Sequence, residues 1–253
     1  MRFASLGSGS RGNGTLVESG DTRILIDCGF FLREAELRLR RFGVEPQTLS
    51  AILVTHEHFD HIGGVSRLAR KYEIPVWMTN GTHAGWEDPH VPTLMRFNPH
   101  EAFRVGGIDV QPFPVPHDAR EPSHFVFSAG GRRLGVISDA GSVTPFMRQS
   151  LSGCDALMLE FNYDPEMLRN GPYPAKLQKR VGGDYGHLSN GQAAELLTQI
   201  DRSRLQHLVL THLSEKNNTP GLALAAAAQA LEDAPPWLVC AHQARGLEWR
   251  EIA

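Results

Sequence analysis

Hydrophobic positions along the chain alternate between short apolar runs typical of strands and longer stretches with the spacing of an amphipathic helix. In the first half, strands are predicted over 2–7, 14–19, 22–29, 49–56, 74–79, 103–115 and 124–129. Helices are predicted between them at about 31–42 and 62–72. The first half therefore has the organisation of a sheet with helices packed against it.

The second half repeats this order of strands and helices. Strands are predicted over 132–141, 154–162, 205–212 and 236–242, and the last of these is expected to close the sheet. One helix is predicted at 188–201 with Ser189 as N-cap, and another at 219–233 with Thr219 as N-cap and Pro220 at its first position. The pattern indicates an α/β protein, in which polar residues at strand ends form the sites.

The densest group of polar residues follows the strand 49–56, where residues 55–64 read THEHFDHIGG. His56 and His58 are two positions apart, so in extended backbone they point the same way. Asp60 and His61 lie one turn further on, and the glycines 63 and 64 are expected to let the chain turn tightly into the next helix. Zinc and similar ions bind histidine nitrogen and carboxylate oxygen, and this cluster already offers enough ligands to imply two ions.

Three further residues at predicted strand ends complete the ligand set: His117, Asp139 and His212. A lone histidine at a strand end is usually structural, but the cluster of residues 56–61 makes metal binding the better interpretation here. We expect one ion at His56, His58 and His117. The second ion is expected at Asp60, His61 and His212, with Asp139 bridging both. One coordination position stays open for water, as a catalytic site requires.

The motif THEHFDHIGG resembles the signature of the metallo-β-lactamase family. The resemblance covers about residues 2–245 and implies an αββα sandwich of two similar halves with a dinuclear metal site along one edge. We therefore expect a single domain over residues 1–253. By the same resemblance Asp27, in the segment LIDCG, is the acid that orients the metal-binding loop without binding metal itself.

A narrower resemblance points to the YycJ (WalJ) type of metallo-hydrolase within this family. It rests on GSGSRGNGTLVE, HDAREP, SDAG, LTHLSEKNN and the long segment 162–190. Members of this type are described as DNA 5′-exonucleases or as uncharacterised hydrolases. The segment GHLSNGQAAEL also resembles the H-S-T segment of tRNase Z, which implies that His187 donates a proton to the leaving group. Glu160 is predicted to hydrogen-bond His187, and both are expected to act in catalysis together with Asp60.

Two segments are candidates for substrate binding. Ser8, Ser10 and Asn13 lie in the glycine-rich segment GSGSRGNG, which either forms an anion-binding nest or is a plain hairpin turn. No G-K-[ST] follows it, so it is not a P-loop. The segment 162–190 carries positive charge interleaved with tyrosines, which suits a single-stranded nucleic acid or else a solvated loop. Its candidate residues are Arg169, Lys176, Lys179 and Arg180.

Composition restricts the partners and the compartment. The formal net charge is −3, so only a local patch would attract nucleic acid. No apolar run is long enough for a membrane span, and the first residues lack the apolar core of a signal peptide. The three cysteines are far apart, which fits a reducing cytosol and favours a cytoplasmic protein.

The expected activity is two-metal hydrolysis of a phosphodiester, with DNA as the nucleic acid substrate. Zinc is the expected ion, although manganese and iron also suit these ligands. One alternative is a small-molecule hydrolase, such as a cyclic phosphodiesterase, lactonase or thioesterase, that uses the same site. A second alternative is a metal-holding interaction protein, against which the open water position argues. The sequence leaves the choice between DNA and RNA, the polarity of cleavage and the oligomeric state open.

Overall fold

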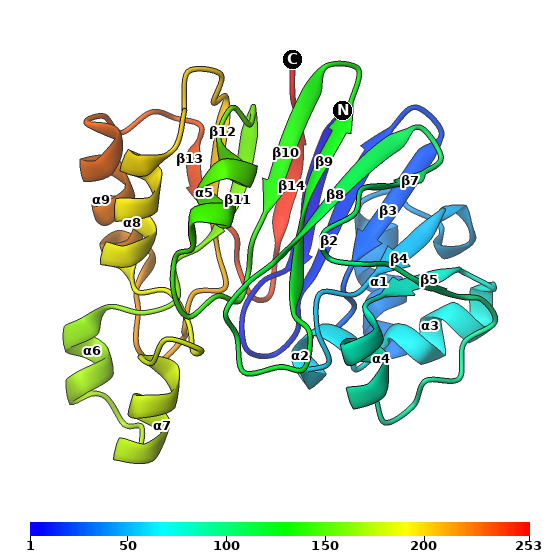
Figure 1. Cartoon of the computed structure of the whole chain (residues 1–253), viewed down its shortest axis with the longest axis horizontal. Coiled ribbons are helices and arrows are strands. Elements are labelled where there is room, and N and C mark those ends of the chain that lie inside the picture. Colours follow the sequence, from blue (N-terminus) through cyan, green and yellow to red (C-terminus); the bar gives the residue numbers. More distant parts are fainter.

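A computed structural model describes residues 1–253. Two seven-stranded sheets face each other, and helices cover the outer face of each sheet (Figure 1). This arrangement confirms the predicted αββα sandwich. None of the helices is both long and apolar enough to cross a lipid bilayer.

The first sheet has the order β14-β1-β2-β3-β4-β5-β6. Its strands are β1 (Arg2–Gly7), β2 (Gly14–Ser19), β3 (Thr22–Ile26), β4 (Ala51–Leu53), β5 (Val76–Met78), β6 (Leu94–Arg96) and β14 (Leu247–Glu251). The second sheet has the order β13-β12-β11-β10-β9-β8-β7. Its strands are β7 (Phe103–Val105), β8 (Ile108–Pro114), β9 (Ser123–Ala129), β10 (Arg132–Val136), β11 (Ala156–Glu160), β12 (His207–Thr211) and β13 (Leu238–Cys240).

The helices follow the strands on the outside of the sandwich. They are α1 (Leu32–Arg41), α2 (Phe59–Ile62), α3 (Val65–Tyr72), α4 (Asn80–Gly85), α5 (Pro145–Leu151), α6 (Pro165–Asn170), α7 (Ala175–Val181), α8 (Asn190–Gln199) and α9 (Pro220–Leu231). Strands β3 to β6 are mutually parallel, as are β10 to β13. The carboxyl ends of parallel strands share one edge of each sheet, and the loops at that edge carry the functional residues.

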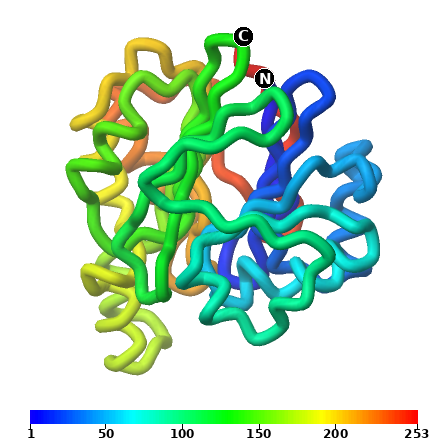
Figure 2. The backbone as a smooth tube through the Cα atoms, turned by 45° about the vertical axis from the view of Figure 1, so that its right-hand side comes forward, coloured from blue at the N-terminus to red at the C-terminus, as the bar shows by residue number.

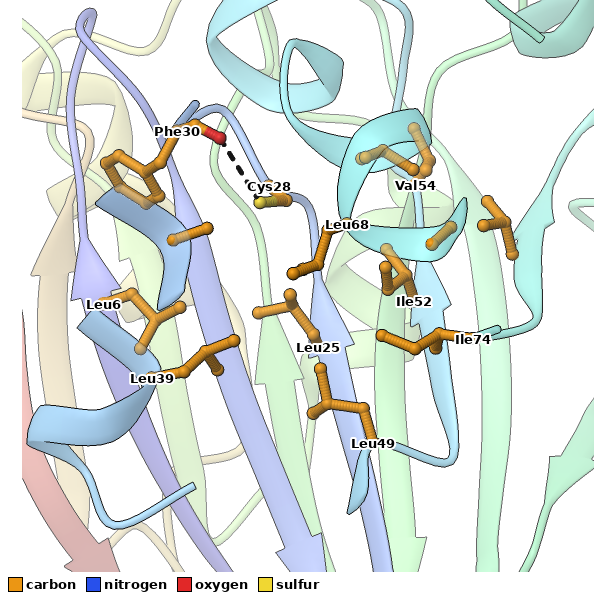
Figure 3. Close-up of a cluster of buried hydrophobic side chains, with 14 of the residues drawn as sticks. Leu6, Leu25, Cys28, Phe30, Leu39, Leu49, Ile52, Val54, Leu68 and Ile74 are labelled. Carbon is orange, nitrogen blue, oxygen red and sulfur yellow. Dashed lines mark hydrogen bonds between the residues drawn. The ribbon is translucent and has the colours of Figure 1, made fainter. Parts of the chain in front are cut away.

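Three buried apolar clusters hold the layers together. One lies between the two sheets and is centred on phenylalanines such as Phe3, Phe125 and Phe127. A second lies between the second sheet and helices α5, α8 and α9. The third joins the first sheet to α1 and α3, where Leu39 and Leu68 pack over the sheet (Figure 3). Truncating such a buried leucine to alanine removes about 2–5 kcal/mol of stability, so these clusters fix the sheet edges on which the site is built.

The predicted caps of two helices are confirmed. Ser189 caps α8 through a capping box with Gln192, and Thr219 caps α9 with Pro220 in the first turn. The predicted closing strand is β13, at the edge of the second sheet, but the chain does not end there. It returns to the first sheet as β14, which pairs antiparallel with β1 and brings the two termini side by side (Figure 2).

The two glycines after the metal motif have a different role from the one predicted. The predicted turn into α3 is present at Gly63 and Gly64, but their φ values of −57° and −107° are ones that any residue adopts, so the turn does not need the freedom of glycine. A Cβ atom at Gly64 would lie 1.8 Å from the carbonyl oxygen of Phe30. Gly64 is required because the backbone after β3 passes directly over the start of α3.

Candidate metal centre and active site

The seven predicted metal ligands meet at the carboxyl edge of the two sheets. The first sheet contributes four, from the segment that follows β4 and runs into α2: His56, His58, Asp60 and His61. The second sheet contributes three, which follow β8, β10 and β12: His117, Asp139 and His212. Residues more than 150 positions apart therefore converge because the parallel strands of both sheets end at the same side of the sandwich.

His56, His58 and His117 form the first predicted group, and their ligand atoms lie within 4.8 Å of one another. His117 Nδ1 lies 2.9 Å from the carbonyl oxygen of Gly186, which can only accept a hydrogen bond. Neutral His117 therefore carries its proton on Nδ1 and presents the Nε2 lone pair. That Nε2 lies 3.2 Å from His58 Nδ1, so both nitrogens face the same point.

Asp60, His61 and His212 form the second predicted group, again within 4.8 Å. His61 Nδ1 lies 2.8 Å from Asp27 Oδ2, and His212 Nδ1 lies 3.1 Å from Glu160 Oε1. Because these carboxylates accept hydrogen bonds from Nδ1, the Nε2 atoms of both rings are turned toward Asp60. A carboxylate behind a histidine is the usual support of a metal ligand.

Asp139 lies between the two groups, at the position predicted for a bridging ligand. Its Oδ2 is 3.0 Å from His61 Nε2, and its Oδ1 is 3.9 Å from His117 Nε2. It also clusters with His56 and His61 as a possible cation site. One carboxylate thus contacts histidines of both groups.

Two buried atoms in this cluster show that the residues fit metal ions. His56 Nε2 and Asp139 Oδ2 are buried and make no hydrogen bond, although Asp139 Oδ2 lies 3.0 Å from His61 Nε2. Leaving a buried polar atom unsatisfied costs about 1–3 kcal/mol, and more for a charged group. A divalent cation bound here would satisfy both atoms, and the set of histidines and carboxylates is the chemistry that such ions select.

The carboxylates at this edge raise the pKa values of two histidines of the cluster, His61 and His212. Burial lowers the pKa of His212, but Asp139, Asp60 and Glu160 outweigh burial and raise it to about 10. For His61, burial again lowers the pKa, and the nearby Asp139, Asp60 and Asp27 raise it well above its usual range. The negative field that holds these protons would also attract cations, which compete with protons for the same nitrogens.

Asp27 supports the metal loop as the family resemblance implies. Its Oδ1 accepts the backbone N–H of Thr55 at 2.8 Å, and its Oδ2 accepts the Thr55 hydroxyl and His61 Nδ1 at 2.8 Å each. Asp27 itself has φ of +58°, and His212 has φ of +52°. Left-handed backbone is uncommon for residues other than glycine and persists where the surroundings hold it, typically at functional sites.

Glu160 connects His187 to the metal cluster. Its Oε1 lies 2.8 Å from His187 Nδ1 and 3.1 Å from His212 Nδ1. Its Oε2 accepts the backbone N–H groups of Ala140 and Leu188, so all its lone pairs point at donors. Burial lowers the pKa of His187, but Glu160 and Asp139 together outweigh burial and raise it above its usual value. The predicted contact between Glu160 and His187 is present, and the link to His212 was not predicted.

A cleft of about 370 Å³ opens over these residues. Its lining combines residues of the metal cluster with residues of α7 and of the loop after β1. They are Ser10, His58, Phe59, Asp60, Asp118, Asp139, Tyr173, Leu177, Arg180, Val181, Gly186, His187 and His212. His187 is 21% exposed at the cleft wall, and Arg180 reaches the cleft from α7.

Only some of the residues predicted to bind substrate lie at the cleft. Ser10 and Arg180 line the cleft. Lys176 and Lys179 are exposed on α7 beside Arg180. Arg169 is exposed at the end of α6 and lines neither the cleft nor the surface around the two lysines. The segment 162–190 thus contains the two short helices α6 and α7, and α7 carries its basic residues past the cleft.

Ser8 and Asn13 lie behind the cleft instead of at its wall. The Ser8 hydroxyl accepts the backbone N–H of His212 at 2.8 Å, and the Asn13 amide lies 3.0 Å from His61 Nε2. The N–H groups of this turn are largely used within the chain: Asn13 Oδ1 accepts the N–H of Gly9, and Gln243 Oε1 accepts the N–H of Arg11. An anion-binding nest of free N–H groups is thus absent, and both side chains hold metal-site residues in place.

Asp118 is the main site residue that the sequence reasoning missed. It lies 3.6 Å from His117 Nε2 and 3.7 Å from His58 Nε2, and it accepts a 2.5 Å hydrogen bond from Arg180 Nε. Burial raises the pKa of Asp118, but the bond from Arg180 and the nearby His117 and His58 together outweigh burial and lower it. Its position directly after the predicted ligand His117, in the segment HDAREP, was the available signal.

Comparison with known proteins places this arrangement in a family. The sequence pattern described as "Beta-lactamase superfamily domain" matches residues 22–213 of the chain. The chain belongs to the β-lactamase superfamily. All seven clustered ligands fall inside the matched residues.

Relatives within this superfamily cover most of the chain. "Exodeoxyribonuclease YycJ" of Bacillus anthracis is 36% identical over 237 residues, which cover 92% of this chain and 90% of that protein. "Exodeoxyribonuclease WalJ" of Streptococcus pneumoniae is 33% identical over 231 residues, which cover 88% and 85%. The metallo-β-lactamase fold protein YhfI of Bacillus subtilis has a similar structure, with a TM-score of 0.76 over 98% of both chains at 16% identity, which shows the shared fold.

Proposed function

We propose that this protein is a dinuclear metal-dependent phosphodiesterase that degrades DNA from an end, as an exodeoxyribonuclease. The observation that carries the proposal is the joined cluster of seven ligands and the pair His187–Glu160 at one cleft. The likeness to exodeoxyribonucleases over most of the chain supports the choice of DNA. We further propose that residues 1–253 act as one domain, because both sheets contribute ligands to the same cleft.

The ligand residues would hold two divalent ions, with zinc the proposed metal. His56, His58 and His117 would bind one ion, and the second would bind to the group formed by Asp60, His61 and His212. Asp139 would contact both. Such ions supply an activated water near neutral pH and neutralise charge on the phosphate oxygens.

His187 is proposed to protonate the leaving oxygen. Its Nδ1 is held by Glu160, which leaves Nε2 as the atom free to donate into the cleft. The raised pKa of His187 favours the protonated ring, which is the form that a general acid requires. Glu160 acts through His187 and His212, so it is a positioning residue in this proposal.

Arg180 is proposed to bind a phosphate of the strand, with Lys176 and Lys179 attracting the rest of the backbone. Arg180 is held over the cleft by Asp118, and its side chain is 59% exposed. The guanidinium can therefore reach an incoming phosphate while Asp118 keeps it near the metal ligands. Ser10 also lines the cleft and is proposed to contact the same strand.

A nuclease assay on the metal-loaded chain tests the proposal. The substrates are single- and double-stranded DNA and RNA labelled at the 5′ or the 3′ end, and the control variant carries Asp60→Ala and His61→Ala. We expect stepwise products from one end of DNA that the control does not form. Turnover of a lactone or a cyclic phosphodiester without cleavage of any nucleic acid would instead support the small-molecule alternative.

A further inference from the structure

A second cavity of about 530 Å³ adjoins the metal-site cleft. It lies between α2, α3 and the segment after α4, and it shares His58 and Phe59 with the cleft. Two aromatic side chains form its rim: Phe31 is 59% exposed and Phe59 is 64% exposed. Their ring centroids are 5.8 Å apart in an edge-to-face arrangement. Large exposed aromatic rings that line a cavity mark a binding surface more often than isolated surface residues do.

The backbone holds both rings in fixed relation to the metal ligands. Phe31 precedes α1 and Phe59 begins α2, two segments that are joined by the hydrogen bond from Cys28 N–H to the carbonyl of His61 at 2.7 Å. A Cβ atom at Gly29 would lie 1.8 Å from the carbonyl oxygen of Asp60, so the two segments are in direct contact. The aromatic pair and the metal-binding loop are thus one packed unit.

The charge of this cavity differs from that of the cleft. Its lining includes three acids, Glu57, Glu87 and Asp88, against the single cation Arg67. Asp88 is paired with Arg70, and Glu57 accepts the backbone N–H of Arg120. Such a lining disfavours a phosphate and suits an uncharged planar group with amino donors. Nucleobases have that chemistry, and they stack on exposed aromatic rings in proteins that bind single strands.

We propose that Phe31 and Phe59 form a stacking platform for a nucleobase beside the scissile phosphate. The inference rests on the proposed nuclease function and adds a preference for single-stranded ends. The sugar-phosphate backbone would lie in the cleft under Arg180, while the adjacent base turns into the second cavity. A duplex end would have to unpair a base to reach the platform, and unpairing costs a few kcal/mol.

The test compares Phe31→Ala with Leu37→Ala, a change at a leucine on α1 that is 53% exposed and lines no part of either cavity. On single-stranded DNA we expect kcat/KM to fall about tenfold in Phe31→Ala, the size of one lost stack, and to stay unchanged in Leu37→Ala. Phe31→Tyr keeps the ring and should restore activity. Metal content should match the wild type in all three variants.

A second assay uses DNA strands that each lack one base, at a different position in each strand, and tests whether Phe31 acts on one particular base. When the missing base is the one that would stack on the platform, cleavage by the wild type should slow about as much as Phe31→Ala slows cleavage of intact DNA. Phe31→Ala should then cleave this abasic strand no more slowly than the wild type does. If the wild type cleaves DNA but no position shows this coupling, the platform is wrong and the nuclease function stands. An apolar protein partner on these rings would give that result. If the wild type cleaves no nucleic acid, both proposals fail.

Discussion

The residues at the bottom of the cleft are mostly buried, whereas the cationic residues at its side are exposed. The bottom consists of the seven predicted metal ligands, which are mostly buried, and several of them are hydrogen-bonded to the surrounding chain, as His61 is to Asp27 and His117 is to Gly186. The side consists of α7, whose cationic residues are exposed, and this helix projects from the body of the sandwich (Figure 1). In the proposed mechanism the buried residues would bind metal and determine the chemistry, whereas the exposed helix would contact the substrate strand.

The largest expected effect comes from removing the shared ligand. Asp139→Ala should lower metal content and reduce turnover by at least about a thousandfold, since both groups lose a carboxylate that supports metal catalysis. Metal analysis of the purified chain and the DNA cleavage assay measure the two effects. Asp109→Ala, a change at an exposed acid on β8, is the matched control. Full metal content in Asp139→Ala would exclude it as a bridging ligand.

His187→Ala separates chemistry from metal binding. Loss of a general acid lowers turnover by about a hundredfold to ten-thousandfold, while the seven ligands remain. We therefore expect a large fall in kcat with unchanged metal content. His187 also lies near Asp139, Glu160 and His212 in a group that could hold a cation. Loss of metal in His187→Ala would reassign it as a ligand.

Proton competition predicts how metal binding depends on pH. The raised pKa values of His61 and His212 stabilise the metal-free fold below the unfolded-state pKa of about 6.5. That stabilisation is lost as pH rises through the raised pKa, which is about 10 for His212. Metal binding displaces the protons on His61 and His212. Lowering the pH below 7 should therefore weaken the metal affinity by up to about a hundredfold per pH unit, a factor of ten for each proton. Metal titrations and thermal melts at pH 6, 7 and 8 measure this, and a pH-independent affinity would contradict it.

The smallest effects are expected on α7. Arg180→Ala should raise KM for DNA about tenfold with little change in kcat, since a charged hydrogen bond to phosphate contributes about 1.5–3 kcal/mol. Lys176→Ala and Lys179→Ala should each weaken the salt dependence of single-strand binding. The slope of the logarithm of the binding constant against the logarithm of the salt concentration should become less steep by about 0.7. Arg169→Ala, a change at an exposed cation away from the cleft, serves as the control. If Arg180→Ala instead lowers kcat alone, Arg180 acts in the transition state.

The contrast between the bottom and the side of the cleft also explains which parts of the fold and of the site could be predicted from the sequence. His56, His58, Asp60 and His61 were predictable because their spacing matches the chemistry of a metal site, and His117, Asp139 and His212 because they follow strands that end at one edge. Ser8 and Asn13 were misplaced because a glycine-rich turn reveals nothing about which internal groups use its N–H donors. Asp118 was missed because its partner Arg180 is 62 positions away. Strand β14 is short and half exposed, so its return to the first sheet depends on tertiary pairing with β1.

The most direct test of the account is DNA cleavage measured against bound metal per chain. Metal is removed with a chelator and returned in known equivalents, and bound metal and cleavage of single-stranded DNA are measured in the same samples. The two ligand groups and the bridging Asp139 predict that cleavage is absent without metal and reaches its maximum at two equivalents per chain. Full cleavage by the metal-free chain, or a maximum at one equivalent, would contradict the dinuclear mechanism.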